Sequence, residues 1–513
     1  MKQFLKIYLW QIISLLTGFA TMFVVTPFLA SNQVQFGIYT FVISLNLFLS
    51  YANFGFLSAG MKFASEAFAR SDRREEQEII GFVFFIMCAA FLVFGLVVLG
   101  LFFYPDSVLK GLKGEANISL ARDLFLVFLL SLPVLVAHRG IQMIFNIRLK
   151  DYLYQRVYSI FNLLKIASVF YFFRDGEYQI VQYYAFTQLL TLLSVLVGVM
   201  TAKIEFSYSF LPLFKAVKYN PEVYKKTKGL AYNSLFVTIS WILYYELDSI
   251  VIGKFIGLRE VAVFNICLSI MTFSRSLYGI LYNPFTAKFN HFIGRDEHVN
   301  FKAAFYKILV LGVPLSVIPT AVILLTMRSF ILSWVGVDYE AAIPIITVMF
   351  ASYFVTFLSN PTSIAMVALQ NIRDLYVISA ILPLLYWLGV IITYNYFGLL
   401  SFGVFKLVAA IISAAFYFHY AKKMFTISWL DFFKRNILPA LATVIGLSIL
   451  SAAFNDFLPQ SKGRLEFLQL SFGIFAYSLI GMILYYFLSK DFQKVLNGLL
   501  LNLFSKSGIK YGK

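Results

Sequence analysis

Charged residues are scarce in this 513-residue sequence: they make up 13% of it, whereas 60% is hydrophobic. Soluble domains carry about 25% charged residues, so this chain lacks the polar side chains that would cover a water-exposed surface. The composition excludes a soluble fold and predicts an all-α integral membrane protein. The formal charge of +17 would suggest nucleic acid as the partner of a soluble protein. In a membrane protein, however, Lys and Arg collect in cytoplasmic loops, so we expect no nucleic-acid partner.

Cysteine is nearly absent, and the motifs of nucleotide chemistry are missing. Cys88 and Cys267 fall in separate apolar runs, which is neither a metal-site nor a disulfide pattern. The sequence has no GxxxxGK(S/T) phosphate loop, and no segment between apolar runs is long enough to fold as a nucleotide-binding domain. We therefore expect no enzyme activity, no bound metal and no cofactor. The first apolar run lacks a short core followed by a cleavage site, so we expect a retained first helix.

Long hydrophobic runs are what this sequence has in abundance. A transmembrane helix needs about 20 mostly apolar residues, and about fourteen segments meet that requirement. The first six lie at 9–30, 37–58, 79–103, 122–145, 154–173 and 178–201. The other eight lie at 230–252, 261–284, 304–327, 342–369, 375–396, 401–421, 436–455 and 465–488.

The Lys and Arg residues alternate across these segments. With the N-terminus in the cytoplasm, 29 of the 42 fall on the cytoplasmic side and 9 on the opposite side. A missed helix would scramble this alternation downstream, so the positive-inside rule predicts an even number of spans with both termini in the cytoplasm. These sums count Arg122, Arg156 and Lys307, which lie at span ends, with the adjoining loops. The remaining four lie deeper inside spans, and they are Arg139, Lys165, Arg275 and Lys406.

A weak internal repeat divides the chain into halves. KFASEAFARSD (62–72) follows the second span and KFNHFIGRD (288–296) follows the eighth, at a spacing of about 225 residues. Internal repeats are common in transporters. The repeat predicts two six-helix bundles, an appended helix pair and a cytoplasmic tail. These expected domains are 1–203, 225–423, 436–488 and 489–513, respectively.

Three of the four intramembrane cations have polar neighbours on their own helix. Charges inside the bilayer are expensive and normally face a bundle interior or a watery cavity. Lys165 shares a helical face with Asn162, Arg275 has polar residues one to three turns earlier, and Arg139 follows His138. We expect Arg139, Lys165 and Arg275 to line a substrate cavity, with Lys165 and Arg275 facing a space shared by the two halves. A structural tie to helix-end carbonyls is the alternative. The expected polar lining comprises Asn46, Ser50, Asn53, Asn162, Asn265, Ser269 and Thr272.

Two acids and one further lysine complete the intramembrane charges. Glu246 and Asp248 would lie about 200° apart on a continuous helix, so they cannot share a face. Asp248 continues a polar stripe that includes Ser234, and it is the stronger of the two candidates for carrying an ion or proton. It could instead simply accept hydrogen bonds from a neighbouring helix. Lys406 lies nearer the outer face, where we expect its side chain to reach the headgroups. Four cations against two acids would attract anions and repel cationic drugs.

Three stretches carry a resemblance to a known family. They are PFLASNQVQFGIYTF (27–41), YANFGFLSAGMKFASE (51–66) and DSIVIGKFIGLREVAVFNI (248–266). With the fourteen spans, they resemble the multidrug/oligosaccharidyl-lipid/polysaccharide exporter superfamily, and within it the polysaccharide-transporter branch of O-antigen-type flippases. The resemblance implies a flippase in the bacterial plasma (inner) membrane for undecaprenyl-pyrophosphate-linked oligosaccharide, coupled to H⁺ or Na⁺. It also implies polysaccharide polymerase machinery as a further partner.

Other functions compete with this interpretation. Flippases of the peptidoglycan precursor share the architecture, but they are expected to carry cations in the first helix, and span 9–30 has none. Drug exporters of the superfamily favour acidic cavities for cationic substrates. A non-transporting component of a polysaccharide assembly complex has no need of cations near the midplane. Since Arg and Lys would offset the desolvation of a pyrophosphate, the charge balance favours the flippase.

Overall fold

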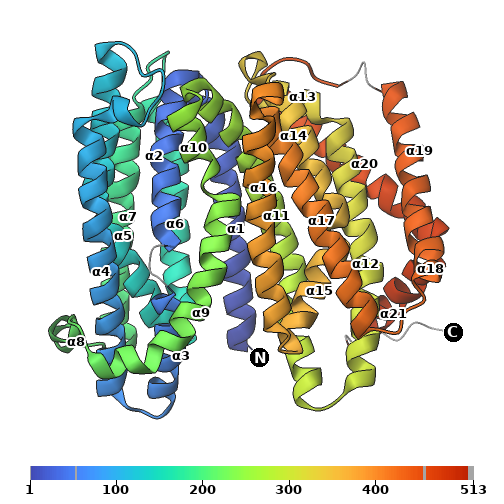
Figure 1. Ribbon diagram of the computed structural model, residues 1–513, viewed down its shortest axis with the longest axis horizontal. Helices are drawn as coiled ribbons and strands as arrows, with labels where there is room; N and C mark the ends of the chain where they lie inside the picture. Colours follow the sequence, from blue (N-terminus) through green and yellow to red (C-terminus); the bar gives the residue numbers. More distant parts are fainter. Residues whose placement is uncertain (1, 52–54, 455–457, 507–513) are drawn as a thin grey trace. The chain divides into compact units, whose positions relative to one another are not determined.

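The computed structural model describes residues 2–51, 55–454 and 458–506, which are predominantly helical (Figure 1). No β-strand occurs in these three ranges, so the expected all-α class is confirmed. The chain divides by packing into two compact units, Met1–Asn265 and Ile266–Lys513. The expected division into 1–203 and 225–423 concerns the internal repeat and stays a prediction.

The first unit contains ten α-helices and the start of an eleventh among its described residues. They are α1 (Lys2–Leu29), α2 (Gln33–Tyr51), α3 (Phe56–Ala69), α4 (Arg73–Phe103), α5 (Glu115–Ile147), α6 (Asp151–Phe172), α7 (Ile180–Phe206), α8 (Phe210–Ala216), α9 (Pro221–Tyr245), α10 (Asp248–Phe255) and α11 (Leu258–Gly294), with the 3-10 turn η1 (Pro105–Ser107).

The second unit continues from α11. Its helices are α12 (His298–Leu325), α13 (Met327–Trp334), α14 (Ala342–Ala351), α15 (Thr356–Ala368), α16 (Ile372–Phe397), α17 (Leu400–Met424), α18 (Trp429–Phe432), α19 (Leu438–Phe454), α20 (Arg464–Leu488) and α21 (Lys490–Lys506). Short turns η2 (Val337–Tyr339) and η3 (Ser352–Val355) and the π-helix η4 (Phe433–Ile437) connect them.

Ten helical segments of the described chain are long and apolar enough to span a membrane, with α14–α15 and α18–α19 each counted as one. The bent pair α9–α10 makes an eleventh if it counts as one span. The chain is therefore a multi-pass membrane protein. A helix lies at each of the fourteen expected segments. Three of these helices, α1, α2 and α6, are not among the candidate spans of the structure. Helix α6 carries Arg156 and Lys165, which lower its hydropathy. The count of fourteen stays a prediction.

Helix α5 is the centre of the first unit, where it packs against α2, α3, α4, α6 and α7 (Figure 1). Glycines permit two of the close approaches. A Cβ at Gly140 of α5 would lie 1.6 Å from the Phe84 ring of α4, and one at Gly198 of α7 would lie 2.6 Å from the Tyr154 ring of α6.

Helix α12 is the centre of the second unit. It packs against α15, α19, α20 and α21, and its residues form much of one apolar core. Phe305 of α12 stacks on Phe425 at a centroid distance of 3.8 Å. The expected appended pair, 436–488, corresponds to α19 and α20, which pack against each other as well as against α12.

Candidate functional site

Lys165 projects from α6 toward α7. Its Nζ donates a hydrogen bond to Thr191 Oγ1 at 2.8 Å and lies 5.3 Å from the centroid of the Tyr158 ring. Thr191 is buried and donates in turn to the Thr187 carbonyl at 2.9 Å. Within the described residues no carboxylate pairs with Lys165. The ammonium therefore has neutral polar and aromatic partners, and no carboxylate among the described residues balances its charge.

His138 and Arg139 of α5 extend this group. His138 Nδ1 is hydrogen-bonded to the Tyr154 hydroxyl at 2.7 Å, and its ring centroid lies 5.0 Å from that of Tyr158. Arg139 and Lys165 both interact electrostatically with His138, and Arg139 also does so with Tyr158. These five residues, His138, Arg139, Tyr154, Tyr158 and Lys165, come from α5 and α6, and we refer to them as the cationic cluster of the first unit.

The expected lining residue Asn162 also belongs to this region, because its side chain hydrogen-bonds Tyr158. Asn46 of α2 is half-buried. Ser50 and Asn53 lie outside the residues whose side chains the structure describes. The structure thus brings two of the three expected cations together around His138, which the sequence indicates as a hydrogen-bonded packing residue and which is bonded to Tyr154.

Arg275, the third expected cation, lies in α11 within the second unit and is half-buried. On the same helix as Arg275, the Tyr278 hydroxyl donates toward the Ser316 carbonyl of α12 at 3.4 Å. The Met271 carbonyl of this helix accepts a hydrogen bond from the Tyr353 hydroxyl of η3 at 2.5 Å. Of the expected lining residues near Arg275, Ser269 is half-buried and Thr272 is exposed. The expected cavity shared with Lys165 stays a prediction.

The two acids lie where α9 gives way to α10. The two helices meet at an angle of 47°, so the continuous helix assumed for Glu246 and Asp248 is wrong. The Leu247 N–H bonds to the Ile242 carbonyl, five residues back, and a new helix starts with Val251 N–H on the Leu247 carbonyl. Because the helix is interrupted between the two acids, the 200° separation does not apply.

Asp248 is completely buried at the start of α10, whereas Glu246 is half-buried at the end of α9. Next to Asp248, Ser249 is also buried and accepts a hydrogen bond from Asn265 Nδ2 at 3.2 Å. Asn265 was expected to line the cavity next to Arg275; the structure shows its amide bonding α10 to the first turns of α11. A buried carboxylate at a helix break is a common position for ion coupling in transporters.

The expectation for Lys406 is wrong. Its side chain is only 3% exposed, and its ammonium lies 4.4 Å from the centroid of the buried Tyr386 ring. A cation over an aromatic face is stabilised without reaching water. Neighbouring α16 and α17 thus bury this lysine, an outcome that the position of the residue along its helix could not reveal.

Sequence reasoning also missed a buried ion pair in the first unit. Arg148 Nη2 lies 2.7 Å from Glu76 Oε1, with the two side chains 7% and 1% exposed. The guanidinium also lies 4.9 Å from the Phe68 ring centroid and 4.8 Å from that of Tyr208. Burial raises the pKa of Tyr208, and the Glu76 carboxylate raises it further, so this phenol stays neutral. Arg148 and Glu76 are 72 positions apart, and no local pattern connects them.

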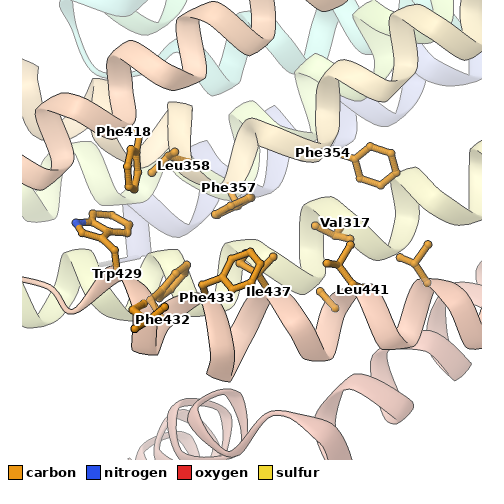
Figure 2. Close-up of a pocket in the computed structure, with 13 residues that line it drawn as sticks. Val317, Phe354, Phe357, Leu358, Phe418, Trp429, Phe432, Phe433, Ile437 and Leu441 are labelled. Carbon is orange, nitrogen blue, oxygen red and sulfur yellow. The ribbon is translucent and has the colours of Figure 1, made fainter.

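The second unit contains an apolar groove of about 670 Å³ (Figure 2). Its walls come from α12, η3, α15, α17, α18, η4 and α19, and Figure 2 shows Phe357, Phe418 and Trp429 gathered around it. The lining residues are Val317, Phe354, Phe357, Leu358, Phe418, Trp429, Leu430, Phe432, Phe433, Ile437, Ala440, Leu441 and Val444. Such a surface can hold a hydrocarbon chain but offers almost nothing to a charged group.

Comparison with known proteins identifies the architecture. No protein-family model and no curated protein matches the sequence. The structure of the lipid II flippase MurJ in an inward closed conformation matches with a TM-score of 0.67 at 15% identity, over 97% of this chain and 99% of MurJ. An inward-facing multidrug resistance transporter of the MATE family and MOP superfamily matches with a TM-score of 0.60 at 14% identity. This protein has the fold of MurJ and the MATE transporters.

The extent of the matches differs. The MATE transporter matches over 81% of this chain and 94% of its own. A MOP-superfamily transporter from Pyrococcus furiosus, whose reversed binding-pocket polarity suggests a different function, matches with a TM-score of 0.53 at 15% identity, over 82% and 94%. The match to MurJ leaves out only 3% of this chain. The resemblance to the superfamily is thus confirmed for the fold.

Proposed function

We propose that this protein is a flippase that carries polyprenyl-pyrophosphate-linked oligosaccharide across the bacterial plasma membrane by alternating access, for the synthesis of a cell-surface polysaccharide. The observation that supports this most is the cationic cluster of the first unit. Lys165 has a hydroxyl and a ring for partners rather than a carboxylate. A cation without an acidic partner is costly inside a membrane protein, and an anionic substrate would offset that cost.

The chemistry of the substrate fits the cluster. A pyrophosphate that leaves water loses hydration worth several kcal/mol per charge, which only nearby cations and hydrogen-bond donors can replace. Arg139 offers a planar guanidinium, which matches phosphate oxygens in a two-point contact. Lys165 offers a point charge, and Tyr158 lies close to both cations. Arg275 is the cation that the second unit would add.

The lipid part of the substrate fits a different surface. The apolar groove of about 670 Å³ in the second unit offers aromatic and aliphatic walls for part of a polyprenyl tail. One of its walls is α19, and the match to the lipid II flippase MurJ covers 97% of this chain. The match to the MATE transporter leaves about a fifth of this chain uncovered, which favours the flippase over a drug exporter.

Coupling to an ion gradient is the next part of the proposal. Asp248 is the candidate carrier of H⁺ or Na⁺, because it is completely buried beside the break between α9 and α10. Glu246, on the other side of the break, is the second candidate. A broken span leaves backbone groups available to an ion at the depth where a continuous helix would have used them.

A cation-coupled multidrug exporter is the alternative, supported by the fold shared with the MATE transporter. The charges oppose it, because Arg139 and Lys165 would repel a cationic drug. The Pyrococcus furiosus transporter, described as having reversed pocket polarity and a different function, suggests that one fold serves substrates of opposite charge.

The test is flipping of a fluorescent polyprenyl-pyrophosphate-linked oligosaccharide in proteoliposomes. We expect Arg139→Gln, Lys165→Met and Arg275→Gln each to reduce the rate strongly at normal insertion, and Arg275→Lys to reduce it less. The matched control is Lys110→Met, because Lys110 donates to the Phe255 carbonyl at 2.7 Å outside the cluster. Normal flipping by the three charge-removing variants would refute the cationic mechanism, and export of cationic drugs by the parent protein would favour the alternative.

A further inference from the structure

A π-helix forms part of the wall of the apolar groove. The five residues Phe433–Ile437 are wound in this form between α18 and α19, and Phe433 and Ile437 line the groove. π-Helices are rare and occur mainly as single turns within α-helices, frequently at functional sites. Their backbone hydrogen bonds span five residues instead of four, and a carbonyl at the change from one winding to the other can take a donor from a neighbouring side chain.

The junction between α20 and α21 supplies those donors. The Ser489 hydroxyl donates to the Arg435 carbonyl at 2.9 Å, and the Tyr485 hydroxyl donates to the Asn436 carbonyl at 3.2 Å. Tyr485, Ser489 and Asn436 are all completely buried. Two carbonyls of the π-helix are therefore bonded by side chains that lie more than 48 positions further along the chain.

A buried carboxylate connects the same junction to the groove. Asp491 Oδ2 accepts a hydrogen bond from the Tyr306 hydroxyl at 2.7 Å and a long one from Asn436 Nδ2 at 3.5 Å. The Tyr306 ring packs edge-on against Phe432, which lines the groove, at a centroid distance of 6.0 Å. We refer to Tyr306, Asn436, Tyr485, Ser489 and Asp491 as the 436 cluster.

We propose that the 436 cluster is a positioning device for the apolar groove: it holds 433–437 as a π-helix and thereby keeps Ala440, Leu441 and Val444 of α19 turned toward the groove. A change in winding by one residue rotates everything downstream by about 100°, which would turn this apolar face away. The groove is where we place the polyprenyl tail, so the inference deepens the proposed function. The α20–α21 junction touches neither tail nor head group and acts only through the groove wall.

The direct test measures the width of the groove. Nitroxide labels on Phe418→Cys and Leu441→Cys, which lie on different walls, report their separation by pulsed electron paramagnetic resonance in phosphatidylglycerol-containing vesicles. Cys88 and Cys267 are replaced by Ala. We expect Tyr485→Phe and Asp491→Asn to shift or broaden the distance distribution. The matched control is Tyr477→Phe: Tyr477 is also in α20, but its hydroxyl donates at 3.2 Å to the Leu447 carbonyl in the body of α19.

If Asp491→Asn fails to fold, Tyr306→Phe tests the same cluster. This substitution removes one hydroxyl and keeps the ring against Phe432. Unchanged distances in Tyr485→Phe and Tyr306→Phe would overturn the proposal, and so would an equal shift in Tyr477→Phe. The readout involves no oligosaccharide. A parent protein that fails to flip the lipid-linked substrate would therefore refute the proposed function, while the distances would still decide the role of the 436 cluster.

Discussion

At the scale of single residues, the partners of a cation separate structural from functional roles. Arg148 is buried against the carboxylate of Glu76 at 2.7 Å, whereas Lys165 is bonded to the neutral hydroxyl of Thr191. In the first case the charges cancel inside the protein. In the second the positive charge stays available to a ligand. Both residues look alike in the sequence as basic residues in or near a helix.

The buried ion pair leads to a stability prediction. We expect Glu76→Gln to lower the free energy of unfolding by about 3–5 kcal/mol, because Arg148 would remain buried without a compensating charge. Thermal unfolding in detergent, followed by intrinsic fluorescence, measures the change. The matched control is Glu78→Gln: Glu78 pairs with Arg74 at 3.0 Å on the surface, and such pairs contribute about 0–1 kcal/mol. Equal destabilisation by the two substitutions would show that the buried pair contributes no more to the free energy of unfolding than the surface pair.

At the scale of elements, most helices follow directly from sequence patterns, and the exceptions concern how they are interrupted. Asp72 caps α4 through the Glu75 N–H at 2.9 Å, and Asn220 followed by Pro221 starts α9, as helix-start signals predict. The break after α9 has no proline or glycine in YYELDSI (244–250). The hydrophobic pattern runs through it unchanged, so the sequence predicted one continuous span where the structure has two helices.

That break leads to a prediction on coupling. We expect Asp248→Asn to shift the pH or sodium dependence of flipping, because Asn keeps the shape of Asp248 but cannot carry a proton or balance a cation. The measurement is the flipping rate in proteoliposomes under imposed proton and sodium gradients. Asp106→Asn is the control, since Asp106 is an exposed residue of η1. An unaltered ion dependence in Asp248→Asn at reduced or normal rate would assign Asp248 a purely structural role.

At the scale of the whole molecule, the distribution of Lys and Arg predicts the orientation in the membrane. The segment 202–229 includes α8 and carries Lys215 and Lys218, and with the N-terminus inside it lies in the cytoplasm. Labelling from either side of the membrane tests this orientation.

We expect a membrane-impermeant maleimide added to intact cells to leave Lys218→Cys unlabelled and to label Lys113→Cys, which lies in the predicted outer loop and is exposed. Both variants carry Cys88→Ala and Cys267→Ala. Permeabilised cells should show labelling at both positions, which verifies that position 218 is accessible from inside. Ready labelling of position 218 from outside would reverse the proposed topology.

The sequence by itself determined the membrane class, the all-helical architecture and the approximate places of the long apolar helices, because these depend on local hydropathy. It also singled out Arg139 and Lys165, because a charge in an apolar run is visible without a structure. Only the tertiary structure decided that Lys165 of α6 lies near His138 of α5, that Lys406 is buried over Tyr386, and that Glu76 pairs with Arg148. The tertiary structure alone also revealed the π-helix and the side chains of the α20–α21 junction that donate to its carbonyls. Each of these contacts joins different helices, and which faces meet is set by side-chain packing rather than by any local pattern along the chain.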